Sequence, residues 1–187
     1  MVAPKNIVDS YRDLPAETRE AIGAYWRNQM AQHAGTPWED FCRAWSLMID
    51  GDAQGAEAAL TRVAASSDAK AVAQARTTLA LLNEEDERRA SEEYEQAAAH
   101  PSATFAMYKR AERLRLENKP GEAEALLKQA LARADDGDVP GVQFLAAEYV
   151  LLLLALGRRE DARELLRQVI EKYPNDLALR RKLKQIE

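Results

Sequence analysis

The sequence has a single cysteine, Cys42, and only two histidines, His33 and His100. A lone cysteine cannot form an internal disulfide, so a disulfide-stabilised secreted fold is excluded. No Cys/His cluster has the spacing of metal ligands. We therefore expect no metal site, and we expect a cytoplasmic protein in which Cys42 packs as a small apolar side chain.

Long apolar segments are also missing. The longest apolar run, Tyr149–Leu156, is far shorter than the ~20 residues that span a membrane, and the first residues contain no apolar stretch of signal-peptide length. The formal net charge is −5, and this deficit of basic residues argues against a general nucleic-acid binder. We expect no membrane span and no nucleic-acid partner.

Catalytic motifs are absent too. The sequence has no G-x-S-x-G motif, no Walker-type phosphate loop and no dinucleotide fingerprint. The two glycines of residues 51–55 follow an expected helix rather than a strand, so they predict a turn. We therefore expect no catalytic residues, no cofactor and no enzymatic activity.

Alanine, leucine, glutamate and arginine are abundant, and they favour an all-α fold. One pattern recurs four times: a small residue, a bulky residue four positions later, and a small or branched residue three positions after that. The copies are Ala56–Leu60–Val63, Ala90–Tyr94–Ala97, Ala123–Leu127–Ala130 and Ala162–Leu166–Val169. They begin 34, 33 and 39 residues apart. A period near 34 residues is typical of stacked helix hairpins, in which small residues let neighbouring helices approach closely.

Helix caps and breakers divide the chain into pairs of helices. We expect a polar, irregular start up to Leu14 and then a helix over 15–33. The predicted organisation is one α-solenoid domain with an N-terminal capping segment (1–36), four repeats (37–67, 68–101, 102–139 and 140–174) and a C-terminal capping helix (175–187). The loop 135–141 accounts for the step of 39 residues, and its aspartates lack the spacing of a calcium loop.

The turns inside the hairpins have their own sequence pattern. Gly51 and Gly157 lie at the turns of the first and fourth hairpins, where a positive φ angle is often required. Asn118 is a comparable residue in the third hairpin, whereas Glu85 in the second is not. Ahead of the first hairpin, residues 36–39 (Thr-Pro-Trp-Glu) predict a capping box.

This arrangement resembles the tetratricopeptide repeat (TPR) family, over about residues 38 to 174, without indicating a subfamily. The fourth repeat, LLALGRREDARELLRQVIEKYPND, matches the family's spacing at Gly157, Ala162, Leu166, Val169 and Pro174. The third repeat, ENKPGEAEALLKQAL, matches at Ala123, Leu127 and Ala130. The first two repeats depart from the family early in their first helices, at Asp40, Arg43, Gln74 and Thr77. The resemblance implies a right-handed superhelix of antiparallel hairpins with a capping helix at each end.

The resemblance also implies a concave groove, lined by the first helix of each repeat, that binds a protein or peptide. The candidate groove residues are Trp38, Phe41, Trp45, Leu79, Phe105, Tyr108, Glu112, Arg115, Phe144 and Leu151. The family's clamp for acidic C-terminal tails is not expected, because Phe41 and Trp45 occupy positions where it needs lysine and asparagine. The groove is apolar and aromatic, so an apolar or amphipathic segment is the expected ligand.

Several of these features have a second interpretation. The stripe Trp38, Phe41, Trp45 could instead pack against the N-terminal helix through Trp26 and Met30. The Phe105 helix could show ordinary packing between repeats plus an ion pair. The run 149–156 is either core, a homodimer interface or the floor of the groove. The basic last helix could contact an acidic partner or anionic lipid, or be a solvated face.

The function predicted from these features is a non-catalytic protein–protein interaction module, a scaffold or adaptor. The first alternative is a dedicated chaperone for an aggregation-prone or secreted client. The second alternative is a regulatory subunit of an enzyme complex.

Overall fold

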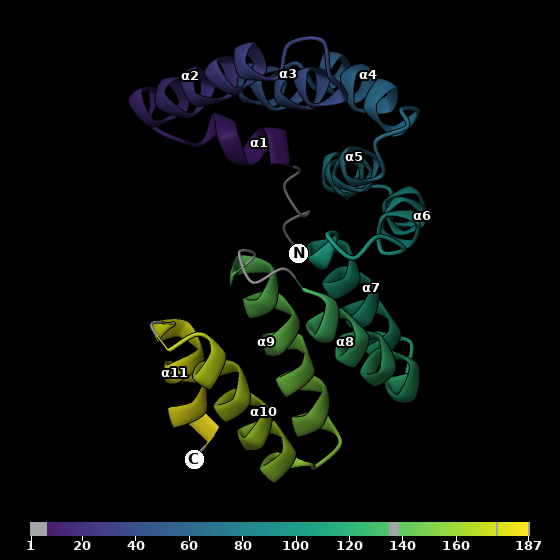
Figure 1. The fold of residues 1–187 in the computed structure, drawn as a ribbon, viewed down its shortest axis with the longest axis vertical. Coiled ribbons are helices and arrows are strands. Elements are labelled where there is room, and N and C mark those ends of the chain that lie inside the picture. The colour runs from purple at the N-terminus through teal and green to yellow at the C-terminus, as the bar shows by residue number, and fades with distance from the viewer. Residues whose placement is uncertain (1–6, 135–138, 175, 187) are drawn as a thin grey trace. The chain divides into compact units, whose positions relative to one another are not determined.

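The structure, a computed structural model, describes residues 7–134, 139–174 and 176–186. Within these ranges the chain forms eleven helices and no strand, which confirms the all-α fold predicted from the sequence (Figure 1). The helices belong to two compact units, Met1–His100 and Pro101–Glu187. The boundary between the units lies beside the predicted junction of the second and third repeats. The single solenoid domain expected from the sequence stays a prediction.

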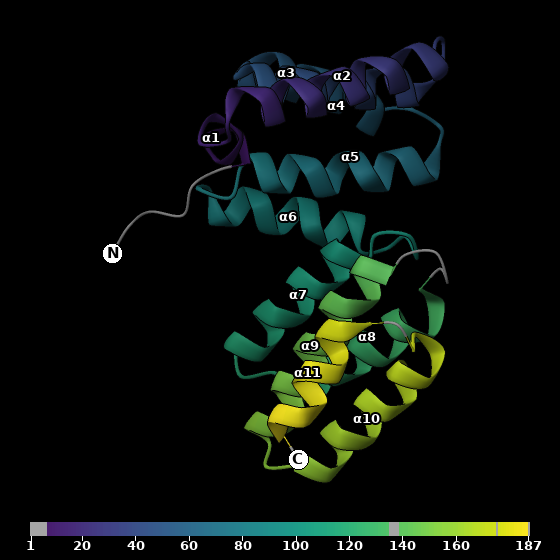
Figure 2. The ribbon, with the colours of Figure 1, turned by 90° about the vertical axis from the view of Figure 1, so that its left-hand side faces the viewer.

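The first unit contains α1 (Ile7–Arg12), α2 (Ala16–Gln32), α3 (Pro37–Asp50), α4 (Ala53–Ala64), α5 (Ala69–Leu82) and α6 (Glu87–Ala97). Successive helices from α2 to α6 pack against one another, and Figure 2 shows α5 and α6 side by side along their length. The helix caps and breakers predict helices over 15–33, 37–50, 54–65, 69–82 and 87–99, and these agree with α2 to α6 to within two residues at each end. Local capping explains this agreement: the Asp68 carboxylate, for example, accepts hydrogen bonds from the backbone N–H groups of Lys70 and Ala71 at the start of α5.

The irregular start predicted for the first residues is wrong from Ile7 onward, because Ile7–Arg12 forms α1. This helix has only six residues and would not be stable alone in water. Tertiary contacts hold it. Val8 is 2% exposed and belongs to the core of the first unit, while the Tyr11 ring meets the Trp45 ring edge-on. The sequence pattern missed α1 because its stability comes from distant residues.

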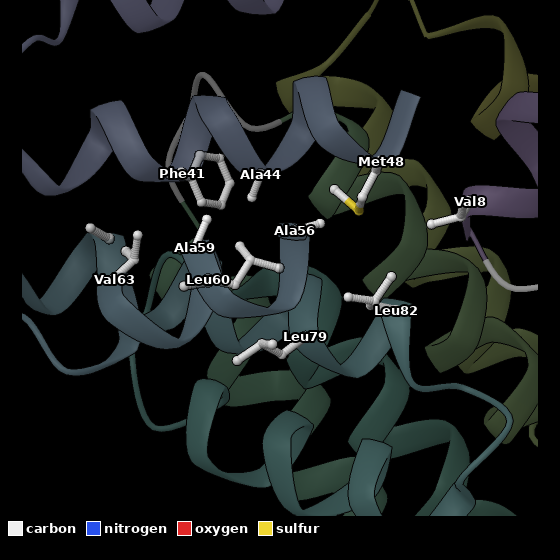
Figure 3. Close-up of a cluster of buried hydrophobic side chains, with 12 residues drawn as sticks. Val8, Phe41, Ala44, Met48, Ala56, Ala59, Leu60, Val63, Leu79 and Leu82 are labelled. Atoms are coloured by element: carbon white, nitrogen blue, oxygen red, sulfur yellow. The ribbon is translucent and has the colours of Figure 1, made fainter. Parts of the chain in front are cut away.

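The core of the first unit lies between α3, α4 and α5 (Figure 3). Met48 of α3 and Leu60 of α4 have no exposed surface, and each contributes about 2 kcal/mol by burial. Between these bulky side chains, Ala44, Ala56 and Ala59 are also completely buried. The alanines therefore act as the small spacers that the repeated pattern predicts, since a larger side chain would separate the helices.

The start of α3 differs from the predicted capping box. Thr36 is the N-cap residue and Pro37 is the first helical residue, as predicted, but the Thr36 hydroxyl donates to the His33 carbonyl at 2.7 Å. The Glu39 carboxylate reaches back one residue further than expected and accepts from the Gly35 N–H at 2.8 Å. The φ angle of +76° at Gly35 turns its N–H toward Glu39. The Glu39 carboxylate thus accepts a backbone hydrogen bond at the start of α3, as in a capping box, but from Gly35 instead of Thr36.

The second unit contains α7 (Thr104–Leu116), α8 (Pro120–Arg133), α9 (Val139–Ala155), α10 (Arg159–Lys172) and α11 (Leu177–Ile186). α9 packs against each of the other four helices of this unit. Within the apolar run 149–156, Tyr149, Val150, Leu152 and Leu153 are at most 6% exposed, whereas Leu151 and Leu156 are each 43% exposed, so only half of the run is core. The sequence predicts this helix over 142–156, but α9 begins three residues earlier, with a proline in its first turn, where proline is tolerated. The rest of the predicted acidic loop, including Asp135, Asp136 and Asp138, lies outside the described residues.

The hairpin turns follow the prediction from glycine and asparagine. Gly51 and Gly157 have φ angles of +87° and +73°, and Asn118 has a φ angle of +60°. Asn118 is the only non-glycine residue with positive φ among those that the structure describes. Glu85 does not take this conformation, so the second hairpin turns differently. In the third and fourth hairpins, the backbone N–H after the left-handed residue donates back into the preceding helix, from Lys119 and Arg158.

Candidate functional site

The aromatic stripe predicted on α3 lies against α2 rather than on an open surface. The Trp45 ring stacks on the Trp26 ring with centroids 5.2 Å apart, and Phe41, only 7% exposed, meets the Trp26 ring edge-on. The Trp38 indole N–H donates to the Asp68 carboxylate at 3.0 Å, which ties α3 to the N-cap of α5. Leu79, also predicted as a groove residue, is 4% exposed in the core. These side chains hold the first unit together.

The second unit brings six of the predicted residues together on one surface. α7 contributes Phe105, Tyr108, Glu112 and Arg115, which recur at the spacing of one helix face, and α9 contributes Phe144 and Leu151. α7 and α9 are in contact. We call this surface, together with Glu148 of α9, the α7–α9 face. It is formed by the first helices of two successive hairpins, as the groove prediction requires.

Three rings form the aromatic end of the α7–α9 face. The Phe144 ring meets the Phe105 ring edge-on at 5.3 Å and lies nearly parallel to the Tyr108 ring at 5.4 Å. Phe144 is nevertheless 44% exposed. Its edge therefore remains available for further contact, while its neighbours fix its orientation. The Lys109 ammonium lies 5.7 Å from the Tyr108 ring centroid and adds a cation–π contact.

An ion pair lies in the middle of the α7–α9 face. The Arg115 Nε donates to Glu148 Oε1 at 2.5 Å, although Glu148 is only 2% exposed. Burial raises the pKa of Glu148, and the hydrogen bond from Arg115 opposes that rise. The same hydrogen bond raises the pKa of the Arg115 guanidinium, so the bond favours the ionised pair while the burial of Glu148 opposes it. Glu112 lies beside them and accepts from the Tyr108 hydroxyl at 3.3 Å.

Sequence reasoning missed Glu148. It is the only charged residue in α9, an isolated carboxylate within an apolar helix. It follows Phe144 by four residues and precedes Leu151 by three, which places it on the face that carries both. That spacing was a usable signal for its position. Its burial was not foreseeable, because it depends on Arg115, which lies 33 residues earlier in the chain.

The far end of the α7–α9 face carries Leu151, which is 43% exposed. The face as a whole is therefore apolar at both ends and carries paired charges between them. A surface of this kind can bury apolar side chains of a partner and orient them through its charges. Among the described residues, no group of three or more His, Cys, Asp or Glu side chains could hold a metal ion. In the same ranges, no helix is both long and apolar enough to cross a bilayer.

Stacked helix pairs with an exposed apolar face define a helical-repeat protein of the interaction class. The comparison with family models specifies which class, because residues 114–186 match the tetratricopeptide repeat family. The matched segment runs from the end of α7 through α11 and therefore lies within the second unit. This match suggests a protein–protein interaction module, because the tetratricopeptide repeat is generally a non-catalytic interaction fold. Searches of curated proteins and of solved structures gave no match.

Proposed function

We propose that this protein is a non-catalytic scaffold or adaptor, and that its α7–α9 face binds an apolar or amphipathic segment of a partner protein. The observation that carries the proposal is the exposure of Phe144 and Leu151, at 44% and 43%, on either side of a buried ion pair. Both side chains belong to a helix whose other bulky apolar residues are largely buried. The cytoplasmic location expected from the sequence belongs to the same proposal.

The rigidity of the face supports this use. The Phe144 ring is held by two other rings, and Arg115 is held by a carboxylate with almost no exposed surface. Side chains that are already fixed lose little conformational entropy when a partner binds. The apolar area still exposed on Phe144 and Leu151 can be buried, and burial of apolar area is the main driving force of association. Paired charges between them favour a defined orientation of the segment.

The test begins with a photo-cross-linking amino acid at position 144. Cross-linked partners are identified by mass spectrometry, and the segment that carries the cross-link is synthesised. The affinity of that peptide is then measured by isothermal titration calorimetry for the wild type, Phe144→Ala and Leu151→Ala. We expect each substitution to weaken binding about tenfold, because each removes a side chain that the peptide buries.

The chain offers a matched control. Leu156, which directly follows α9, is 43% exposed, the same fraction as Leu151, but it lies five residues further on. At 100° per residue it therefore faces a different direction. Leu156→Ala should leave the affinity within about twofold of the wild type. Equal losses for Leu151→Ala and Leu156→Ala would refute the proposed face.

The chaperone alternative makes a different prediction. A chaperone would suppress the aggregation of unrelated unfolded clients, and no single peptide would account for its binding. Light scattering with two unrelated reduced and denatured proteins separates the two functions. If the wild type suppresses the aggregation of both proteins and Phe144→Ala does not, the chaperone function is favoured over the adaptor function.

A further inference from the structure

The helix α11 differs from the other helices of the second unit in its charge. It carries four cations, Arg180, Arg181, Lys182 and Lys184, and no carboxylate. The second helices of the two preceding hairpins, α8 and α10, carry equal numbers of cations and carboxylates. α7 also carries more cations than carboxylates, four against one, so what distinguishes α11 within the second unit is that its cations have no carboxylate on the same helix.

The cations of α11 also lack the partners that other cations have. In α7, Arg113 pairs with Glu117, and in α10, Arg163 pairs with Glu160. None of the four cations of α11 forms an ion pair with a carboxylate among the described residues. Their one hydrogen bond joins the Arg180 Nε to the Pro174 carbonyl, at 2.8 Å. Among the residues that the structure describes, no carboxylate therefore neutralises their positive charge.

Three of these cations form a single exposed stripe. Leu177, Arg180, Arg181 and Lys184 lie at positions i, i+3, i+4 and i+7 of α11, which share one helix face, and all four are exposed. The opposite face carries Leu179 and Ile186, which are 3% and 7% exposed. Two arginines of α10, Arg159 and Arg163, donate to the Ile186 carbonyl and hold the end of the helix. The basic stripe is thus fixed on the unit and points away from its core.

We propose that the α11 stripe is a docking site for an acidic segment of a protein partner. The stripe spans about 10 Å along the helix axis and presents three cations, so it complements a segment with several carboxylates over a few residues. Leu177, 67% exposed at the end of the stripe, provides contact for one apolar residue next to those carboxylates. The site is separate from the α7–α9 face and does not depend on it.

The chemistry of the stripe favours a protein segment over a membrane. A helix that lies in a bilayer interface buries a broad apolar face among the lipids. In α11, Leu179 and Ile186 are already buried within the unit, and Leu177 alone is strongly exposed. Nucleic acid is also disfavoured, since the chain as a whole has a formal net charge of −5.

The test uses the full chain and two fluorescein-labelled peptides. One peptide is composed of glutamate and leucine, and the other has lysine in place of each glutamate. We expect fluorescence anisotropy to show binding of the glutamate peptide only. Raising the salt concentration from about 0.05 M to about 0.5 M should weaken that binding, because the charges are exposed. The triple variant Arg180→Glu, Arg181→Glu, Lys184→Glu should weaken it at least about tenfold.

A second triple variant controls for the change in net charge. Lys70→Glu, Arg88→Glu and Arg167→Glu alter three exposed cations that lie apart in the chain, and they change the net charge by the same amount. This variant should stay within about threefold of the wild type. Equal weakening by both triple variants would overturn the proposal, and so would a glutamate peptide that fails to bind. Loss of its binding in Phe144→Ala would place the peptide on the α7–α9 face and overturn the separate site.

Binding of the α11 stripe to a membrane or to a second copy of this chain would also overturn the proposal. Binding to phosphatidylserine vesicles, lost in the α11 triple variant and without binding of the glutamate peptide, would identify a membrane. Self-association in analytical ultracentrifugation that the same variant abolishes would identify a second copy of this chain. Circular dichroism of each variant shows whether the helices are retained, so that unfolding is not mistaken for lost binding.

Discussion

The Nε of Arg115 and the Oε1 of Glu148 are 2.5 Å apart in a place where Glu148 has almost no contact with solvent. Removal of a carboxylate from water has a large free-energy cost. Its attraction to one cation offsets much of that cost, but often not all of it. The pair therefore adds little to stability as a whole. Loss of Arg115 alone leaves Glu148 buried and uncompensated, whereas Arg115 itself is partly exposed.

The first prediction concerns the loss of Arg115. Arg115→Leu should lower the free energy of unfolding at pH 7 by about 3 kcal/mol, because Glu148 remains buried without its partner. The double variant Arg115→Leu, Glu148→Leu should recover most of that loss. Urea unfolding of the single and double variants completes the cycle. A double variant no more stable than Arg115→Leu would contradict the role assigned to the pair.

The second prediction is the pH dependence of the same variant. Because burial raises the pKa of Glu148 in the folded state, this group favours folding most at pH values below its unfolded pKa, near 4.5. Its contribution declines as the pH rises through the folded pKa. Removal of Arg115 should raise that pKa further, so Arg115→Leu should approach the wild type in stability as the pH falls from 7 toward 4.5. A difference that stays constant over this range would exclude Glu148 as its cause.

The third prediction concerns Glu124, whose pKa shifts in the opposite direction. Hydrogen bonds from Lys128, Arg158 and the Tyr149 hydroxyl lower its pKa to about 2. Its contribution to stability is therefore present above pH 4.5 and is lost as the pH falls toward 2. Glu124→Gln should cost about 1 kcal/mol at pH 7, since the group is near the surface. The variant should also lose less stability than the wild type between pH 4.5 and 2, measured by thermal unfolding at each pH.

The fourth prediction uses two glycines of the second unit. Gly157 has a φ angle of +73°, in the left-handed region, whereas Gly121 is helical, and a Cβ atom at either position meets no other atom within 4 Å. Gly157→Ala should therefore destabilise the protein by about 1 kcal/mol through backbone strain alone. Gly121→Ala should be neutral or stabilise it by a few tenths of a kcal/mol, because it restricts the unfolded chain. Chemical denaturation of both variants measures whether the two changes in the free energy of unfolding have opposite signs.

The fifth prediction tests the alanine spacers. Ala130 of α8 has no exposed surface, while Ala125 on the same helix is exposed. Ala130→Leu should destabilise the protein by about 1–3 kcal/mol, because the larger side chain forces neighbouring helices apart. Ala125→Leu should change stability by less than about 0.5 kcal/mol. Similar melting temperatures for the two variants would mean that the buried position tolerates repacking.

The helices were predictable because their determinants are local. Caps such as Asp68, turn residues such as Asn118 and the alanine spacing all act within a few residues of the element they specify. The same reasoning failed for α1, since Val8 is held by side chains of distant helices. A short helix that lacks its own cap cannot be predicted from its local sequence, because only its tertiary contacts stabilise it.

The candidate site was predictable only in part, for a related reason. Helical spacing placed Phe105 and Tyr108 on one face, and the repeat pattern aligned that face with Phe144. The pattern could not decide which apolar residues remain exposed. Trp45 and Leu151 occupy the same position in their hairpins, six residues before the turn glycine, but the Trp26 ring of α2 stacks on Trp45, whereas Leu151 keeps 43% of its surface. Exposure depends on which neighbouring elements cover a residue, and the repeat does not encode that.

The packing of α3 on α2 has a spectroscopic consequence. All three tryptophans of the chain, Trp26, Trp38 and Trp45, lie in the first unit. Indole emission excited near 295 nm therefore monitors the first unit alone, while far-ultraviolet ellipticity monitors the helices of both. If the two signals change at different denaturant concentrations, the two units unfold as separate cooperative entities.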